Sequence, residues 1–320
     1  MPPKISVIVP IYNAGEYLSR CLTSLSKQTL TDIEIICVLD CPTDGSDKVV
    51  KQYAQFDSRF VVVENEQNIG VAASRNKGIE LAKGEYVGFS DHDDWCEPVM
   101  YEALYSRALT DDYDVVLSDT FIELPKERKI IHVNTTDSQQ ILFSLLLPED
   151  SSHCVNKLAR SVWHSIYRRD FIMDNHVVFY DRKKYLEEDT LFNCQVFARA
   201  PHVTVCHQAY YHWNLRRQTE QSQYGQHFQI APFCNYFRMI KQYVKDEELL
   251  EEVMTSQFYL YWSYYRKIED RVIVKSIGSD IDYLKPYAIL RVYGWLRLIK
   301  SILVYYKFVC YISKLKKLKE

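Results

Sequence analysis

The sequence lacks several features that mark specialised classes of protein. Its 320 residues include only 9 glycines and 10 prolines, which excludes collagen-like and linker-rich chains. No apolar run approaches the roughly 18 residues that a membrane-spanning helix needs, and the first residues lack the apolar core and cleavage site of a signal peptide. The remaining composition, with 47% hydrophobic and 25% charged residues, indicates a folded globular protein of one or two domains.

An excess of either charge is also missing. The 39 basic and 42 acidic residues leave a formal net charge of −3. This balance argues against a nucleic-acid-binding protein, because such proteins are usually clearly basic.

The 9 cysteines form no C-x-x-C pair, and several lie inside apolar runs. We therefore expect reduced, buried thiols in a cytoplasmic protein rather than disulfides or a thiolate metal site.

Short apolar runs alternate with amphipathic segments over the first ninety residues. We expect strands at 5–9, 33–39, 60–63 and 86–90, and helices at 16–27, 46–55 and 71–82. Continuous apolar strands that alternate with helices predict a parallel sheet covered on both faces. Ligands bind such sheets at the edge where the strands end, so we expect the functional residues there.

After residue 98 the pattern is mixed. We expect helices at 98–109, 136–147 and 186–199, and strands at 115–118, 203–206 and 210–213. Beyond residue 228 the chain becomes helical and aromatic. The whole pattern predicts an α/β fold with a mostly parallel, Rossmann-like sheet flanked by helices and a C-terminal helical extension.

An acidic loop follows the fourth expected strand directly. Asp91, Asp93 and Asp94 lie within four residues, and crowded carboxylates without a partner are electrostatically unfavourable. A divalent cation such as Mg²⁺ or Mn²⁺ relieves this repulsion, since both prefer oxygen ligands. The alternative is an exposed acidic turn in which Asp94 caps the next helix, and the loop alone does not decide between the two.

Two further segments point to the same edge of the sheet. Asp40 ends the second expected strand, where an acidic residue can bind a ribose or a base edge. Arg75 lies in the third expected helix, behind the small residues of Asn68 to Asn76, and its guanidinium suits phosphate oxygens. Taken singly, Asp40 is equally explained as a turn residue and Arg75 as part of a solvated helix face.

Together these segments resemble the family 2 glycosyltransferases, an inverting group with the GT-A fold. The run from Ser6 to Asn13 looks like the first strand and the Pro-x-Tyr-Asn turn of that family. The run from Asn68 to Asn76, with Gly84 beyond it, matches closely, and the acidic loop resembles the D-x-D-D metal motif. The resemblance is strong over residues 4–100 and continues more weakly to about residue 222.

The resemblance implies transfer of a sugar from a nucleoside-diphosphate donor, with UDP favoured, to a hydroxyl of a glycan or lipid-linked acceptor in surface polysaccharide synthesis. It implies a Mn²⁺ or Mg²⁺ ion held by Asp93 with help from Asp91. The donor-binding residues that it implies are Pro10, Tyr12, Asp40, Asn68, Arg75, Asp91 and His92.

The catalytic base implied by the resemblance lies outside the acidic loop. The segment Leu186 to Phe192 is similar to the Glu-Asp motif that opens a helix near the acceptor site of the family. We expect Asp189 to take the proton of the acceptor hydroxyl, with Glu188 as the second candidate. An acidic cluster that merely caps the helix would have the same composition.

The chain departs from the family pattern at several positions. Leu39 replaces the first acid of a usual pair, so that Asp40 alone would contact the nucleobase of the donor. Cys41-Pro42 replaces Gly-Ser. His92 fills a position that is usually small, and it can tune the metal, contact the donor or remain solvated. Later in the chain, Arg216 or Arg217 could hold the diphosphate from a loop.

The C-terminal residues differ in charge from the rest of the chain. Residues 286–320 carry eight basic residues and one acid, which leaves 31 basic and 41 acidic residues in 1–285. Arg297, Lys300, Lys307 and Lys314 fall on one side of an expected amphipathic helix, which suits an anionic membrane surface on the cytoplasmic side. Packing of this helix on the protein body is the alternative. We expect a transferase domain at 1–225 and a helical extension at 226–320, peripheral to the inner face of the plasma membrane.

Two other functions remain open at the level of the sequence. A nucleotidyltransferase also pairs acids with a Rossmann-like half, but it would carry a basic, glycine-rich triphosphate loop near the start, and Pro10 to Gly15 does not look like one. A non-catalytic protein that binds nucleotide or glycan is compatible with the altered Leu39 and Cys41-Pro42. The presence of Asp91, Asp93 and Asp189 favours the enzyme.

Overall fold

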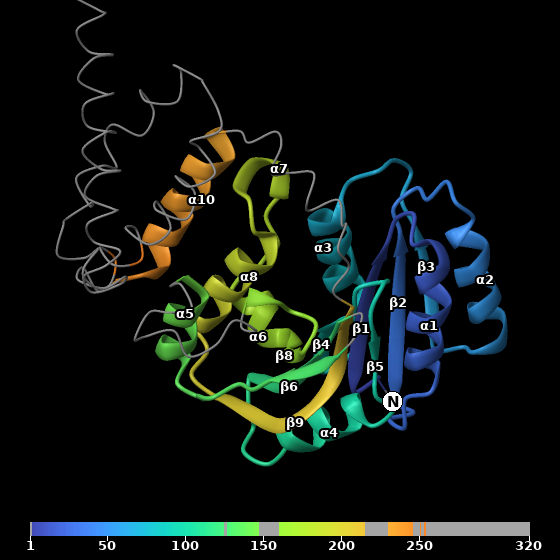
Figure 1. Cartoon of the computed structure of the whole chain (residues 1–320), viewed down its shortest axis with the longest axis horizontal. Helices are drawn as coiled ribbons and strands as arrows, with labels where there is room; N and C mark the ends of the chain where they lie inside the picture. The colour runs from blue at the N-terminus through green and yellow to red at the C-terminus, as the bar shows by residue number, and fades with distance from the viewer. Residues whose placement is uncertain are drawn as a thin grey trace, which may run out of the picture.

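The computed structural model describes residues 2–124, 127–146, 160–214 and 230–245, together with residues 250 and 253. Its centre is a nine-stranded sheet with the strand order β3-β2-β1-β4-β8-β6-β9-β5, in which β7 pairs with β6 at the side. Helices flank this sheet (Figure 1). The predicted α/β fold class is therefore confirmed.

The N-terminal half is a parallel sheet, as its apolar runs predict. Its strands are β1 (Ile5–Ile11), β2 (Ile33–Leu39), β3 (Phe60–Glu64) and β4 (Tyr86–Phe89), and each contact among them is parallel. The helices are α1 (Leu18–Ser26), α2 (Ser46–Phe56) and α3 (Val71–Leu81), and a 3₁₀ turn at Gly15–Tyr17 precedes α1. The expected helix at 16–27 is thus shorter than predicted.

Both faces of β1 are buried, which explains why its sequence is apolar throughout. Val7 and Val9 share a core cluster with Leu18 and Leu22 of α1. Ile8 lies in the other cluster with residues of α3. Since successive side chains of a strand point to opposite faces, α1 and α3 cover opposite sides of β1 (Figure 1).

The second half adds antiparallel strands that the sequence analysis did not predict. Strand β8 (Ser165–Arg168) lies antiparallel between β4 and β6 (Val115–Glu123), and β7 (Arg128–Ile131) pairs with β6. Strand β5 (Trp95–Cys96) follows the acidic loop and pairs antiparallel with β9 (Val203–Asn214). The helices of this half are α4 (Met100–Ala108), α5 (Ser138–Leu146), α6 (Arg169–Asp174), α7 (Arg182–Tyr185) and α8 (Glu188–Phe197).

The prediction of two strands at 203–206 and 210–213 is wrong, because these residues form the single strand β9. Its pairing with β6 shifts register beside Ser118, Asp119 and Thr120. A shift of this kind bends the strand without ending its hydrogen bonding. The polar residues His207 and Gln208 lie exposed at this irregularity, between the two predicted segments.

Helix α10 (Ile230–Tyr243) agrees with the helical character expected after residue 228, over the residues described there. It packs against α7 and α8 (Figure 1). The remainder of the expected helical extension, including the basic tail at 286–320, lies outside the described residues. No helix within the described ranges is long and apolar enough to cross a membrane.

Candidate active site

The acidic loop lies where the order of the parallel strands reverses. From β1 the chain adds β2 and β3 on one side of the sheet, whereas β4 lies on the other side of β1. The loop starts at Ser90, at the end of β4, and the backbone amide of Ser90 donates to the carbonyl of Ile8 in β1. Such a switch point leaves a crevice at the carboxyl ends of the strands, which is where open α/β sheets bind ligands.

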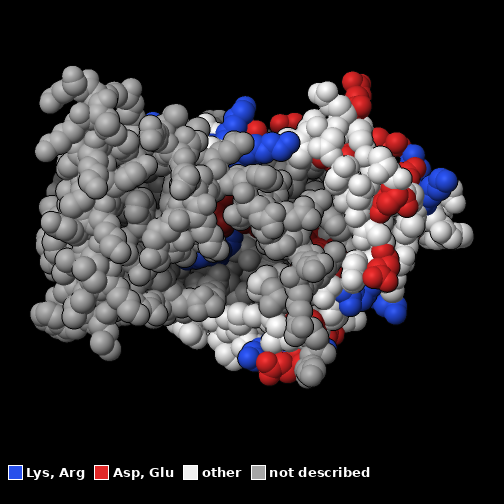
Figure 2. Space-filling model, turned by 45° about the horizontal axis from the view of Figure 1, so that its top comes forward, with Lys and Arg blue, Asp and Glu red and all other residues white. Residues whose placement is uncertain are grey.

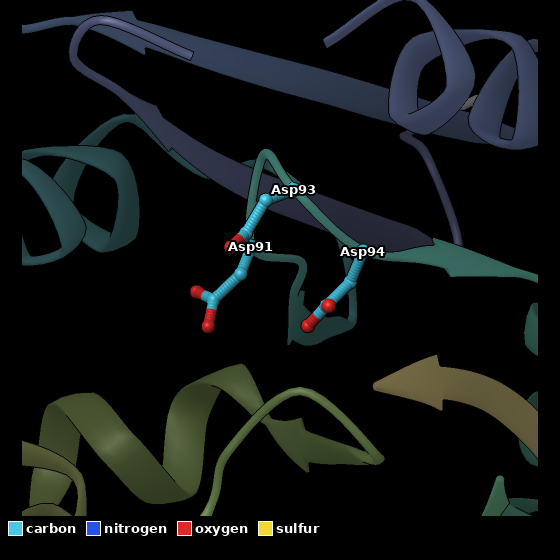
Figure 3. A group of neighbouring side chains, drawn as sticks. All are labelled: Asp91, Asp93 and Asp94. Carbon is cyan, nitrogen blue, oxygen red and sulfur yellow. The ribbon is translucent and has the colours of Figure 1, made fainter. Parts of the chain in front are cut away.

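Three carboxylates leave this loop on the same side (Figure 3). Asp91, Asp93 and Asp94 each offer one oxygen, and these oxygens lie within 4.8 Å of one another. Asp91 and Asp93 are half-buried, whereas Asp94 is 1% exposed. Burial, followed by the charges of Asp93 and Asp91, raises the pKa of Asp94 well above its usual value. An oxygen-rich cluster of this size fits a divalent cation such as Mg²⁺ or Mn²⁺.

Asp94 has its own partners in β9. Its two oxygens accept from the Tyr211 hydroxyl at 3.0 Å and from the backbone amide of Asn214 at 2.7 Å. The Tyr211 hydroxyl also accepts from the amide of Asp91 at 3.0 Å. Asp94 therefore ties the loop to β9 and does not cap the next helix, which leaves Asp91 and Asp93 as the candidate metal ligands.

Arg75 joins the acidic loop to the helix that carries the candidate base. Its guanidinium is buried, with one nitrogen 2.9 Å from Asp91 and another 2.5 Å from Asp189. The second nitrogen also lies 3.8 Å from Glu188. Burial alone would lower the pKa of Arg75, but Asp189, Asp91 and Glu188 outweigh it and raise that pKa. The sequence predicted a guanidinium that meets the donor, and in this structure it pairs with carboxylates.

Asp189 lies in the first turn of α8, with its side chain 23% exposed. Burial raises the pKa of Asp189 to about 8, Arg75 opposes the rise, and Glu188 and Asp91 add to it. A carboxylate with a pKa near neutrality can both hold and release a proton under ordinary conditions. The backbone before the helix has positive φ angles at Leu186 and Glu187, which directs the start of α8 toward Arg75.

Asp40 supports the loop in front of α3. Its carboxylate is 3% exposed and accepts from the amides of Ile69 and Gly70, each at 2.8 Å, and from the Asn65 side chain at 2.9 Å. Asn68 donates to the backbone carbonyl of Asp40 at 3.2 Å. These bonds fix the loop that introduces α3 and Arg75. The predicted contact between Asp40 and the nucleobase of the donor stays a prediction.

Pro10, Tyr12 and His92 lie on the other side of the loop. His92 Nδ1 is 3.1 Å from the carbonyl oxygen of Pro10, so this histidine joins the acidic loop to the end of β1. Tyr12 is 41% exposed at the same edge. Their roles in donor binding stay predictions, and Arg216 and Arg217 lie outside the described residues.

The sequence analysis missed the residues that hold these groups in place. Tyr211 and Asn214 belong to β9, and Asn65 follows β3. Only the pairing of β5 with β9 brings Tyr211 and Asn214 to the acidic loop, and strand pairing at this separation leaves no local signal.

On the face shown in Figure 2, acidic and basic side chains of described residues are interspersed, and both colours appear in the central hollow.

Comparisons with known proteins show which sequences resemble this chain. A sequence model described as glycosyl transferase family 2 matches residues 6–171. The uncharacterized glycosyltransferase YibD of Escherichia coli K12 is 33% identical over 260 residues, which cover 78% of this chain and 71% of that protein. The uncharacterized glycosyltransferase EpsJ of Bacillus subtilis is 32% identical over 212 residues. That match covers 66% of this chain and 61% of EpsJ, so the chain spans less than two thirds of this relative.

A solved structure resembles the fold over almost the whole chain. The structure of S. aureus TarS 1–349 in complex with UDP-GlcNAc has a TM-score of 0.72 and 20% sequence identity. The match covers 99% of this chain and 92% of that chain. At this identity the likeness concerns the fold alone.

We predict that Tyr211→Phe destabilises the protein by about 1–3 kcal/mol, because the buried Asp94 loses a hydrogen-bond donor while the ring contact with Trp163 is kept. Urea unfolding at pH 7 measures the change. Tyr105→Phe is the control, since the Tyr105 hydroxyl bonds Glu85 in an exposed position, and it should change stability by less than about 0.5 kcal/mol. Equal stabilities of Tyr211→Phe and wild type would contradict the role assigned to Tyr211.

Proposed function

Because the chain belongs to glycosyl transferase family 2, we propose that it is a metal-dependent, inverting glycosyltransferase. It would move a sugar from a UDP-sugar to a hydroxyl of a glycan or lipid-linked acceptor in surface polysaccharide synthesis. One observation carries the proposal: the buried Arg75 guanidinium contacts both Asp91 of the acidic loop and Asp189 of α8. The candidate metal site and the candidate base are thereby neighbours. The UDP-GlcNAc complex of the similar TarS structure supports a nucleotide-sugar donor.

Asp91 and Asp93 would hold the metal ion and, through it, the donor diphosphate. A bound Mn²⁺ or Mg²⁺ supplies positive charge where the leaving diphosphate becomes more negative. The half-buried carboxylates of Asp91 and Asp93 supply the oxygen ligands. Asp94, held by Tyr211 and Asn214, keeps the loop in place.

Asp189 would take the proton of the acceptor hydroxyl as it attacks the anomeric carbon of the donor. Arg75 orients this carboxylate through a hydrogen bond of 2.5 Å, and Glu188 is close to the same nitrogen. A direct attack of this kind inverts the configuration of that carbon and forms no covalent intermediate. One carboxylate base and an electrostatically stabilised leaving group are sufficient for it.

A donor screen tests the proposed function. The protein is incubated with UDP-, GDP- and CMP-sugars, with Mn²⁺, with Mg²⁺ and with a chelator, and the released nucleotide is measured. We expect release from a UDP-sugar that the chelator abolishes and Mn²⁺ restores. Release confined to CMP-sugars, or release that the chelator does not change, would contradict the reaction proposed here.

We predict that Asp189→Asn lowers the transfer rate by about 10²–10⁴-fold, because the amide cannot accept the proton. UDP binding, measured by calorimetry, should stay close to the wild-type value. Glu188→Gln is the matched control from the same helix turn, and it should retain much more activity. Activity of Asp189→Asn equal to that of wild type would assign the base to another residue.

The pH profile gives the same assignment a second test. Asp189 must be ionised to act as a base, and its pKa of about 8 means that the ionised fraction falls as the pH falls below that value. We therefore expect the wild-type rate to decline with falling pH, approaching roughly tenfold per pH unit on the acidic limb. A flat profile between pH 6 and 9 would exclude Asp189 as the base.

We further propose that the chain divides into a transferase domain at 1–225 and an extension at 226–320, whose basic tail binds the cytoplasmic membrane surface peripherally. The eight basic residues and one acid of 286–320 support this proposal. Truncation after Lys285 should move the protein from the membrane fraction to the supernatant. If truncated and full-length proteins fractionate alike, the tail does not bind the membrane.

A further inference from the structure

Five side chains form a continuous stack beside the acidic loop. In order they are Arg20 of α1, Trp95 of β5, His212 of β9, Phe121 of β6 and Arg128 of β7. The guanidinium of Arg20 lies 3.6 Å from the centre of the Trp95 ring, and the ring centres of Trp95 and His212 are 4.8 Å apart. The His212 and Phe121 rings follow at 4.6 Å, and Arg128 lies 5.0 Å from Phe121.

His212 is the central layer of this stack, and it is 2% exposed. Its Nδ1 lies 2.8 Å from a carboxylate oxygen of Glu123, and its Nε2 lies 2.8 Å from one of Glu97. An ionised carboxylate only accepts hydrogen bonds, so both ring nitrogens must carry hydrogen for both contacts to be favourable. The two contacts together are satisfied only when both nitrogens donate. Both ring nitrogens contact carboxylates, so neither is left to bind a metal ion or a phosphate.

Cations and aromatic rings therefore alternate through the stack. Arg20, the imidazolium of His212 and Arg128 are separated by the faces of Trp95 and Phe121, and cations are attracted to such faces. Glu123 also pairs with Arg128 at 2.5 Å, so one carboxylate serves two of the cations. The acids Glu97 and Glu123 offset part of the repulsion among the three positive charges.

The stack ends on the acidic loop itself. Arg20 donates to the backbone carbonyl of Asp93 at 3.2 Å, and Trp95 comes two residues after Asp93. Trp95 and His212 also face each other in the pairing of β5 with β9. Any weakening of the stack would release Trp95 and Arg20, and with them the backbone on the C-terminal side of Asp93.

We propose that His212, as an imidazolium, is a positioning residue that holds residues 91–97 in the conformation needed for binding the metal and the donor. A neutral imidazole would donate at only one nitrogen and would turn the lone pair of the other toward a carboxylate. The inference rests on the proposed function for the identity of the ligand, but not for the effect on the loop.

The charged groups that face His212 come from the segments around it. Glu97 and Glu123 are the acids in contact, and Arg20 and Arg128 are separated from it by the rings of the stack. Helix α4 also packs on β9, but its charged residues are engaged elsewhere. Glu102 of α4 bonds Thr29 and Arg107 bonds Thr204.

Hydrogen–deuterium exchange of the full-length protein, without metal or donor, tests the effect on the loop. His212→Phe keeps a stacked ring without the charge, and His212→Gln keeps one donor. We expect exchange in residues 91–97 to be about tenfold faster than wild type in both variants at pH 7. His202→Gln is the control, because this exposed histidine lies at the start of β9 outside the stack.

Calorimetric titration with Mn²⁺ and UDP tests the consequence for binding. Both His212 variants should bind Mn²⁺–UDP about tenfold more weakly, as is usual when residues behind a metal ligand are changed. The rate at saturating metal should stay within about twofold. If residues 91–97 of His212→Phe exchange at the same rate as in wild type, the inference is overturned and the proposed function is untouched. Failure of wild type itself to bind Mn²⁺–UDP would instead overturn the proposed function, while the exchange data would still decide the role of His212.

Discussion

A buried guanidinium among carboxylates is the constraint on which the candidate site depends. Arg75 is 2% exposed, and a buried charge is tolerated only when it is paired. Its partners come from the loop after β4 and from the start of α8, two segments about a hundred residues apart in the chain. Removing Arg75 would leave several acids facing one another, so this residue joins the two parts of the site electrostatically.

The acids of the site divide by burial into two groups. Asp40 and Asp94 are nearly inaccessible, and their oxygens accept hydrogen bonds from backbone amides and from polar side chains. They fix the shapes of the two loops that surround the strand ends. Asp91, Asp93 and Asp189 remain partly exposed, so they are the acids that can reach a ligand. The rigid supports and the reactive groups therefore come from the same residue type in different surroundings.

Much of the fold and part of the site could be predicted from local patterns. The strands of the N-terminal half are continuous apolar runs because both faces of the sheet are covered, and β2 was predicted residue for residue. The acidic loop was selected by its position at a strand end and Arg75 by the small residues before it, whereas Asp189 was implied by the resemblance to the family. Strand β8 escaped prediction because it is short and is recognisable only by its pairing with β4 and β6. Strand β9 was predicted as two strands, and its register shift against β6 falls between the two predicted segments.

The sequence by itself determined which chemical groups are present and which parallel strands end beside them, since apolar periodicity and short motifs depend on neighbouring residues. Only the tertiary structure decided which acid is buried and holds the loop and which stays partly exposed, because burial and hydrogen bonds depend on segments far apart in the chain. It likewise decided that Arg75 pairs with Asp189 and that His212 lies between two carboxylates. The contacts of His212 arise from the second half of the sheet, where β9 pairs parallel with β6 and antiparallel with β5, a pairing that no local pattern specifies.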